Sequence, residues 1–281
     1  FEKIRKNQYY FVDKSGLIEE LLNTESNEVT LITRPRRFGK TLGMSMLASF
    51  FDIRRDSSEL FRGLKISQKE ELCQKWMNQY PVLFVTFKDV DGLDFQSAKE
   101  MLRIQIADRC NEYLCLISSE KVNENDKAIF RQLADVVKGD VSDAMLKTGI
   151  ALIMRMLQDY YEKPVILLLD EYDVPLAKAS AHGYYAEMLE VMRAMISTAL
   201  KDNPSLRFAV VTGCLRISRE SIFTGTNNFV SDTIFDTRLN EYFGFLQDEV
   251  EQLLTAIGAK DKAGIVKEWY DGYHFGSYDV Y

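Results

Sequence analysis

Four short apolar runs alternate along the chain with longer segments of helical periodicity. The runs are dense in Val, Ile, Leu and Phe, show no alternation of polar and apolar positions, and cover residues 28–33, 81–87, 164–170 and 207–213. A strand that is apolar on both sides is typical of a parallel sheet enclosed between two layers of helices. We therefore predict an α/β fold whose recognised strands are buried and mainly parallel.

The segments between these runs have the apolar spacing of amphipathic helices. Predicted helices cover residues 40–51, 93–117, 141–160 and 184–200. Because parallel strands joined through helices need right-handed crossovers, the carboxyl ends of all strands meet at one edge of the sheet. Ligands of such open sheets bind at that edge, and we expect the functional site there.

The pattern changes after residue 213. Residues 214–236 are rich in turn-forming residues, and two helical segments follow at 245–259 and 263–272, each with a glycine near its end. We predict that residues 1–244 form the α/β core and that residues 245–281 form a small helical lid or linker segment.

Composition and charge narrow the functional classes. The chain has 281 residues and a net charge of -7, which argues against a general electrostatic attraction to nucleic acid, although a local basic patch is compatible with it. Its four cysteines form no Cys-x-x-Cys pair and only two histidines are present, so we do not expect a structural zinc site. Scattered cysteines and the lack of an apolar run of ~18 residues predict a cytoplasmic protein without a membrane segment.

The first strand runs directly into a phosphate-loop pattern, "LITRPRRFGKTLGMSML", whose loop we define as residues 34–41. Strand, tight turn, Gly-Lys-Thr and helix follow one another in the order that phosphate binding requires. Gly39 lets the backbone approach a phosphate, Lys40 reaches the β- and γ-phosphate oxygens, and Thr41 offers its hydroxyl to Mg²⁺. Backbone N–H groups and the helix dipole add to the attraction. The predicted nucleotide-binding residues are Arg36, Arg37, Phe38, Gly39, Lys40, Thr41 and Leu42.

The loop departs from the usual pattern at its start. In Gly-x-x-x-x-Gly-Lys-Thr the first glycine falls at Arg34, and the Pro35 that follows has no N–H group. Both precede the amides of residues 38–41 that would enclose the phosphate, so we expect a changed start of the loop and an intact phosphate site. The alternative is a basic turn that contains Gly-Lys-Thr by chance.

A second motif, "VILLLDEYDVPL", has the Walker B pattern of an apolar strand that ends in two acidic residues. Asp170 at the strand tip is placed to hold the Mg²⁺ shell opposite Thr41. Glu171 is placed to orient and deprotonate an attacking water. The alternative is a strand that ends in two solvated carboxylates, and the phosphate loop upstream favours the catalytic interpretation.

The run at 207–213 brings a third set of candidate residues to the same edge. Thr212 would place a hydroxyl near the γ-phosphate, and Arg216 or Arg219 would stabilise charge on the transferred phosphoryl group. Arg216 is the better candidate because it is nearer the strand tip. The alternative is a surface loop with two solvated arginines.

Two further stretches are weaker signals. The aromatic residues of "WYDGYHFG", 269–276, are interpreted as a small core that pins the C-terminal helices, and stacking on a base is the alternative. The arginines of "RPRRFGK" would also suit nucleic acid phosphates. The acidic chain and the adjacent nucleotide motif favour a role within the nucleotide site instead.

As a set, these motifs resemble the AAA-ATPase-like family, predicted bacterial and archaeal P-loop ATPases that are often fused to a PD-(D/E)xK nuclease-like domain. The matching stretches run in order from Tyr9 to Gly276, and "RPRRFGKT" in place of a glycine-led loop is itself typical of the family. The resemblance implies a three-layer α/β/α P-loop NTPase with an extra strand between the phosphate-loop strand and the Asp-Glu strand. It also implies a helical lid near residues 245–271.

The motifs and the resemblance lead to one main functional hypothesis and two rivals. The main hypothesis is a Mg²⁺-dependent ATPase that drives or gates a partner or a C-terminal nuclease-like domain. ATP is preferred over GTP because of the resemblance and the lack of an Asn-Lys-x-Asp run. The first rival is a nucleotide-binding switch with negligible turnover, whose site would need an arginine from a neighbouring copy in a homo-oligomer. The second is a nucleic-acid-associated component, which the net charge does not support.

Overall fold

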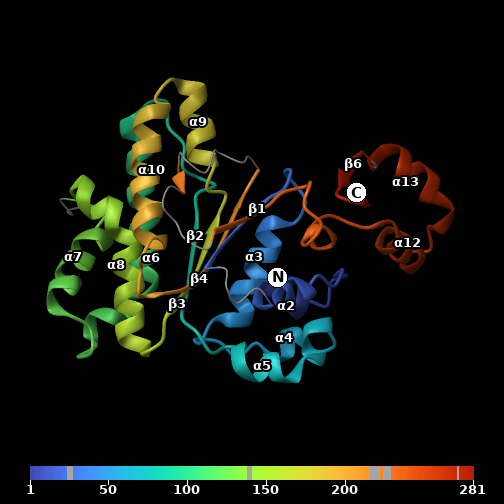
Figure 1. Cartoon of the computed structure of the whole chain (residues 1–281), viewed down its shortest axis with the longest axis horizontal. Coiled ribbons are helices and arrows are strands. Elements are labelled where there is room, and N and C mark those ends of the chain that lie inside the picture. The colour runs from blue at the N-terminus through green and yellow to red at the C-terminus, as the bar shows by residue number, and fades with distance from the viewer. Residues whose placement is uncertain (24–27, 138–140, 215–221, 224–228, 271) are drawn as a thin grey trace.

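A five-stranded parallel sheet forms the centre of the computed structural model, which describes residues 1–23, 28–137, 141–214, 222–223, 229–270 and 272–281 (Figure 1). Its strands are β1 Val29–Thr33, β2 Val82–Thr86, β3 Val165–Asp170, β4 Leu206–Gly213 and β5 Phe229–Asp232. The four predicted strands are confirmed. β5 lies in the stretch predicted as turns, and its sequence carries little strand signal because half of its four residues, Ser231 and Asp232, are polar.

The strand order is β2-β3-β4-β1-β5, so β4 is the extra strand that the resemblance places between β1 and β3. Ile32 of β1 pairs with Thr212 of β4, and Leu169 of β3 pairs with Val211 of β4. This register brings the ends of β1, β3 and β4 to one level at the carboxyl edge, where ligands bind in open α/β sheets.

Helices cover both faces of the sheet and complete the predicted three-layer α/β/α fold (Figure 1). One layer contains α6 Phe95–Glu112, α7 Glu124–Ala134, α8 Asp143–Tyr161 and α10 Tyr185–Leu200, and the other contains α2 Gly16–Leu22, α3 Lys40–Phe51, α4 Ser58–Phe61 and α5 Glu70–Trp76. The short α1 Glu2–Lys6 contacts α3 and α4, and α9 Val174–His182 follows β3. None of the helices in the described part of the chain is long and apolar enough to cross a bilayer.

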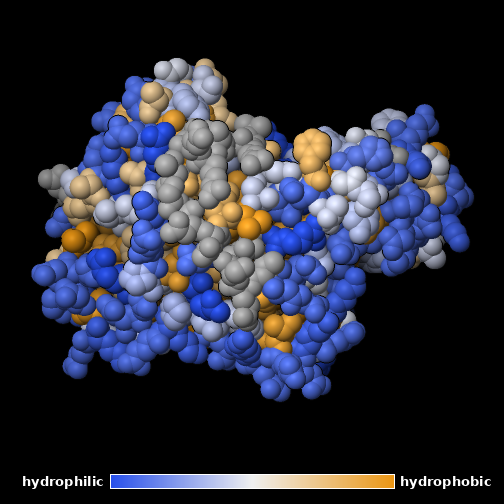
Figure 2. Space-filling model, viewed as in Figure 1, coloured by the Kyte–Doolittle hydropathy of each residue, from blue (hydrophilic) through white to orange (hydrophobic). Residues whose placement is uncertain are grey.

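β3 illustrates why the central strands are mostly apolar on both faces. Leu167 and Leu169 pack into the core beneath α6, α8 and α10, whereas Ile166 and Leu168 pack into the core beneath α3 and α5. Since both faces of the sheet are covered, every position of β3 is buried. The molecular face drawn in Figure 2 is correspondingly hydrophilic, with hydrophobic side chains in small, separate groups.

The C-terminal segment projects beyond α3 (Figure 1) and contains α12 Gln247–Ala256, α13 Ala263–Tyr270 and an antiparallel hairpin of β6 Tyr273–Phe275 and β7 Tyr278–Val280. Both predicted helices are confirmed, with shorter bounds, whereas the hairpin was not predicted. The interpretation of 269–276 as a shared aromatic core is wrong for Trp269 and Tyr270, which are 77% and 67% exposed. Phe275 alone of these aromatic residues is fully buried, and it packs against the phosphate loop.

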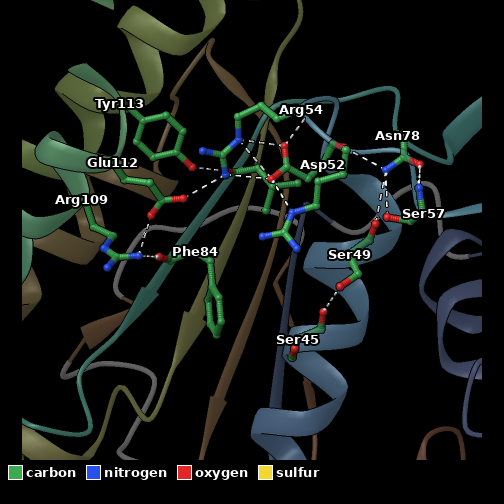
Figure 3. Close-up of polar contacts among 12 residues, drawn as sticks. Ser45, Ser49, Asp52, Arg54, Ser57, Asn78, Phe84, Arg109, Glu112 and Tyr113 are labelled. Carbon is green, nitrogen blue, oxygen red and sulfur yellow. Dashed lines mark hydrogen bonds and ion pairs between the residues drawn. The ribbon is translucent and has the colours of Figure 1, made fainter. Parts of the chain in front are cut away.

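A polar network anchors α3 and α6 at the opposite, amino edge of the sheet (Figure 3). Arg54 donates from Nε to Asp52 Oδ1 at 3.0 Å and from Nη2 to Glu112 Oε1 at 3.0 Å. Its guanidinium carbon lies 4.4 Å from the ring centre of Tyr113, whose hydroxyl donates to the carbonyl oxygen of Val82 at 2.6 Å. Burial raises the pKa of Tyr113, so the phenol remains a donor. With its C-terminal end fixed in this way, α3 directs its N-terminal end toward the carboxyl edge.

Candidate functional site

Side chains from three segments meet at the carboxyl edge of the sheet. Thr41, at the start of α3, donates its hydroxyl to Asp170 Oδ2 at 2.8 Å. Thr212, near the end of β4, donates its hydroxyl to Asp170 Oδ1 at 2.5 Å. Asp170 is the last residue of β3 and is completely buried. The phosphate loop, the acidic strand end and the β4 hydroxyl are therefore joined through one carboxylate.

The oxygen atoms of Thr41 and Asp170 suit a magnesium ion. Mg²⁺ prefers hard oxygen ligands, keeps several waters and is usually held by one or two carboxylates together with substrate phosphates. Thr41 Oγ1 and Asp170 Oδ2 offer a hydroxyl and a carboxylate side by side. Within the described residues no group of three or more His, Cys, Asp or Glu side chains is arranged to hold a metal.

Lys40 lies at the centre of the phosphate loop. Gly39 precedes it with a left-handed φ of 81°, which allows the sharp turn from the loop into α3. The Lys40 side chain is buried, and its Nζ donates to the backbone oxygens of Arg34 at 2.9 Å and Pro35 at 2.8 Å, and to Cys214 Sγ at 3.3 Å. A thiol is a weak acceptor, so a phosphate oxygen can replace Cys214 while both carbonyls keep the amine in place.

Glu171 lies beside this position in a cavity that we call the polar cavity, because most of the residues in its wall are charged. Burial, followed by the negative charge of Asp170, raises the pKa of Glu171 above its ordinary value. The cavity has a volume of about 340 Å³. Cys214, which accepts a hydrogen bond from Lys40, belongs to its wall. The charged residues in the wall are Arg36, Lys88, Glu171, Asp173 and Lys178.

Comparison with known proteins agrees with this arrangement. A sequence model of a family described as "Predicted AAA-ATPase" matches residues 1–223. The chain belongs to the AAA-ATPase-like family. It is also 28% identical over 292 residues to an uncharacterized protein in the vnfD 5' region of Azotobacter chroococcum mcd 1, and the match covers 100% of this chain and 48% of that protein. The chain thus spans about half the length of this relative. No solved structure matches the chain.

In this AAA-ATPase-like chain the unusual arginine at the loop start is buried, and its guanidinium faces β5 and Asn240. Arg34 is 1% exposed. Its Nη1 donates to the backbone oxygens of Thr33 at 2.9 Å and Asp232 at 3.0 Å, and its Nη2 donates to Asp232 Oδ1 at 2.5 Å and Asn240 Oδ1 at 2.8 Å. The idea that Arg34 contacts nucleic acid phosphates is therefore wrong, because the guanidinium is enclosed by protein.

A second pocket, mostly apolar and about 460 Å³ in volume, borders the same loop. Its lining includes Phe11, Val12, Phe38, Leu42, Tyr242 and Leu253. Sequence reasoning missed this pocket because its walls come from the N-terminal segment, the loop, α3 and the C-terminal segment of the AAA-ATPase-like chain. The aromatic stretch at 9–12, which belongs to no predicted helix or strand, is the signal that could have pointed to it.

An ion pair joins the N-terminal segment to α12 beside the apolar pocket. Lys14, which lines the pocket, places Nζ 2.6 Å from Glu249 Oε2 and also donates to the backbone oxygen of Glu241 at 2.6 Å. Burial lowers the pKa of Lys14, and the hydrogen bond to Glu249 opposes that shift. The pair holds α12 next to the pocket, where a lid helix would have to lie.

Five of the seven predicted nucleotide-binding residues line one of the two pockets. Those that line the apolar pocket are Arg37, Phe38, Gly39 and Leu42. Arg36 lines the polar cavity, and Lys40 and Thr41 contact the residues at the strand ends. The predicted Arg216 and its neighbour Arg219 lie at 215–221, outside the described residues.

Proposed function

We propose that this region binds ATP together with Mg²⁺ and hydrolyses the γ-phosphate bond. The proposal rests on one observation: the Thr41 hydroxyl and the Asp170 carboxylate are 2.8 Å apart although 129 residues separate them in sequence. A phosphate loop and an acidic strand end act on a nucleotide only when both reach the same metal ion. Membership of a family described as predicted ATPases supports the same conclusion.

The two pockets support one path for the bound nucleotide. The apolar pocket, with rings and aliphatic side chains such as Phe11 and Leu42 in its wall, suits a purine base. The phosphates would then pass along the amides of residues 38–41 at the N-terminus of α3. The terminal phosphate would accept a hydrogen bond from Lys40 on the side of Cys214, which lines the polar cavity.

Glu171 is the proposed general base. Its carboxylate would accept a proton from a water whose oxygen bonds to the γ-phosphorus, while the bond from that phosphorus to the ADP oxygen breaks. The raised pKa of Glu171 favours proton acceptance over that of an ordinary surface carboxylate. When bound, Mg²⁺ would neutralise charge on the β- and γ-phosphate oxygens. We assign Thr212 to hold the Asp170 carboxylate and Arg216 to stabilise the transferred group.

We further propose that ATP turnover acts on a partner domain. The relative from Azotobacter chroococcum extends well beyond the matched region, which makes up 48% of its length. The nuclease-like domain implied by the family resemblance is the proposed recipient, and a neighbouring copy in a homo-oligomer is a second source of the arginine that completes the site. The buried Arg34 and the net charge of -7 weigh against direct nucleic acid binding by the loop.

Phosphate release with and without Mg²⁺ tests the ATPase proposal. We expect Lys40→Ala to lose nucleotide binding in calorimetry, and Glu171→Gln to bind nucleotide but to turn over about 10²- to 10⁴-fold more slowly, the usual contribution of a general base. Glu187→Gln, an exposed glutamate on α10, is the matched control and is expected to behave like the wild type. Equal rates in all four proteins would refute hydrolysis at this site. Tight binding without turnover at any protein concentration would support the nucleotide-switch alternative.

A further inference from the structure

The phosphate loop is in direct contact with the C-terminal hairpin. The ring centre of Phe38 lies 4.8 Å from that of Tyr273 and 5.1 Å from that of Phe275, both on β6. The backbone oxygen of Phe38 accepts a hydrogen bond from the N–H of Gly244 at 3.1 Å. One loop residue thus contacts both the hairpin and the segment that leads into α12.

Arg34 adds a second connection at the first residue of the loop. Its guanidinium carbon lies 5.2 Å from the ring centre of Phe243 and 5.6 Å from that of Phe275. Its Nη2 donates to Asn240 Oδ1 at 2.8 Å. The Asn240 amide in turn packs against the hairpin turn, where a Cβ at Gly276 would lie 2.8 Å from Asn240 Nδ2. The buried guanidinium therefore holds the loop and the hairpin together.

One peptide plane links phosphate binding to these contacts. The carbonyl of Phe38 and the N–H of Gly39 belong to the same planar trans unit and point in opposite directions. The Phe38 carbonyl accepts the hydrogen bond from Gly244. The Gly39 N–H is among the amides that we assign to the phosphates. A phosphate that fixes the direction of the Gly39 N–H therefore also fixes the direction of the Phe38 carbonyl.

We propose that Arg34 and Phe38 are positioning residues that couple the nucleotide to the docking of the β6–β7 hairpin, so that nucleotide binding strengthens docking. This inference rests on the proposed nucleotide site. Coupling of two equilibria is reciprocal, so docking of the hairpin raises nucleotide affinity by the same factor by which nucleotide raises the docking equilibrium, and a change that undocks the hairpin lowers nucleotide affinity. The hairpin is then the element through which the nucleotide state reaches a partner domain.

Tyr273→Ala tests the coupling from the hairpin side. Tyr273 touches the Phe38 ring but lines neither the apolar pocket nor the polar cavity, so its loss leaves the nucleotide contacts intact. Loss of one edge-on aromatic pair predicts a two- to tenfold fall, roughly, in affinity for a fluorescent ATP analogue with Mg²⁺. Tyr278→Ala is the matched control, because Tyr278 lies on β7 of the same hairpin and its ring is not paired with Phe38. Thermal unfolding of both variants checks that each is folded.

Hydrogen exchange of the wild type supplies the second measurement. We expect the amides of residues 273–281 to exchange several-fold more slowly when a non-hydrolysable ATP analogue and Mg²⁺ are bound. Unchanged exchange at these amides despite nucleotide binding, or equal nucleotide affinities of Tyr273→Ala and Tyr278→Ala, would overturn the coupling and leave the proposed function intact. Absence of any nucleotide binding by the wild type would instead overturn the proposed function, and the coupling with it.

Discussion

Replacing Arg34 with methionine tests whether its guanidinium is a structural element of the phosphate loop. Arg34 Nη2 lies 2.5 Å from Asp232 Oδ1, and the two side chains are 0% and 3% exposed. Methionine preserves an unbranched apolar side chain against the rings of Phe243 and Phe275 but removes the positive charge. The variant therefore leaves Asp232 buried without its nearest cation.

We expect Arg34→Met to lower the free energy of unfolding by about 3 kcal/mol, the lower end of the range for breaking a buried ion pair. The lower end applies because Arg238 Nε lies 3.8 Å from Asp232 Oδ2 and supplies part of the missing charge. Burial raises the pKa of Asp232, and Arg34 opposes that rise, so the variant raises this pKa further. A carboxyl whose pKa is higher in the folded chain than in the unfolded chain favours folding once it is protonated. The loss of stability is therefore expected to be smaller at about pH 5 than at about pH 8.

Urea unfolding followed by circular dichroism measures both quantities. Arg62→Met is the control, because Arg62 forms an ion pair with Glu59 in which the side chains are 76% and 70% exposed. Such a surface pair is expected to change stability by less than about 0.5 kcal/mol. The double variant Arg34→Met/Asp232→Asn is expected to lose less stability than the sum of its single variants, since no stranded charge remains. A loss below about 1 kcal/mol for Arg34→Met at neutral pH would contradict the buried-pair reasoning.

Three further predictions concern the site. The hydrolysis rate is expected to fall on the acid side of its pH profile at a pH above the ordinary glutamate pKa, because the pKa of Glu171 is raised. Arg36→Ala is expected to move this fall to higher pH, because Arg36 lowers the pKa of Glu171. An unmoved fall in rate would exclude Glu171 as the base. Thr41→Ala is expected to raise the Mg²⁺ concentration needed for half-maximal turnover about tenfold or more, measured by metal titration, since one proposed metal ligand is lost. Gly244→Ala is expected to destabilise the fold by about 1–3 kcal/mol in thermal unfolding, since its Cβ would lie 2.4 Å from Val280 Cγ1 and 2.6 Å from Phe38 Cδ1. Gly258→Ala is the control, because Gly258 has a similar positive φ but an added Cβ there would meet no atom within 4 Å. This variant therefore measures the backbone strain alone, and equal losses of stability in the two variants would refute the packing argument.

The central strands and the convergence of the motifs followed from the sequence because both depend on local patterns. The run 164–170 is apolar from Pro164 to Leu169 since its two faces meet two separate cores, and no tertiary detail was needed to predict that burial. The order of strands and helices placed the strand ends at one edge, which is why Thr41 and Asp170 could be expected together. The Gly-Lys-Thr run marked the start of α3 because it too is a local sequence pattern.

Other features were decided only by the tertiary structure. The role of Arg34 depends on Asp232, which is 198 residues away and lies on a strand, β5, whose own sequence gave little signal. The apolar pocket and the hairpin contacts likewise join segments from both ends of the chain. Periodicity reports which side of an element is buried, but it does not report which distant element buries it. A basic residue in a loop therefore looks solvated in the sequence, and only the folded chain shows that a carboxylate, an amide and two aromatic rings enclose it.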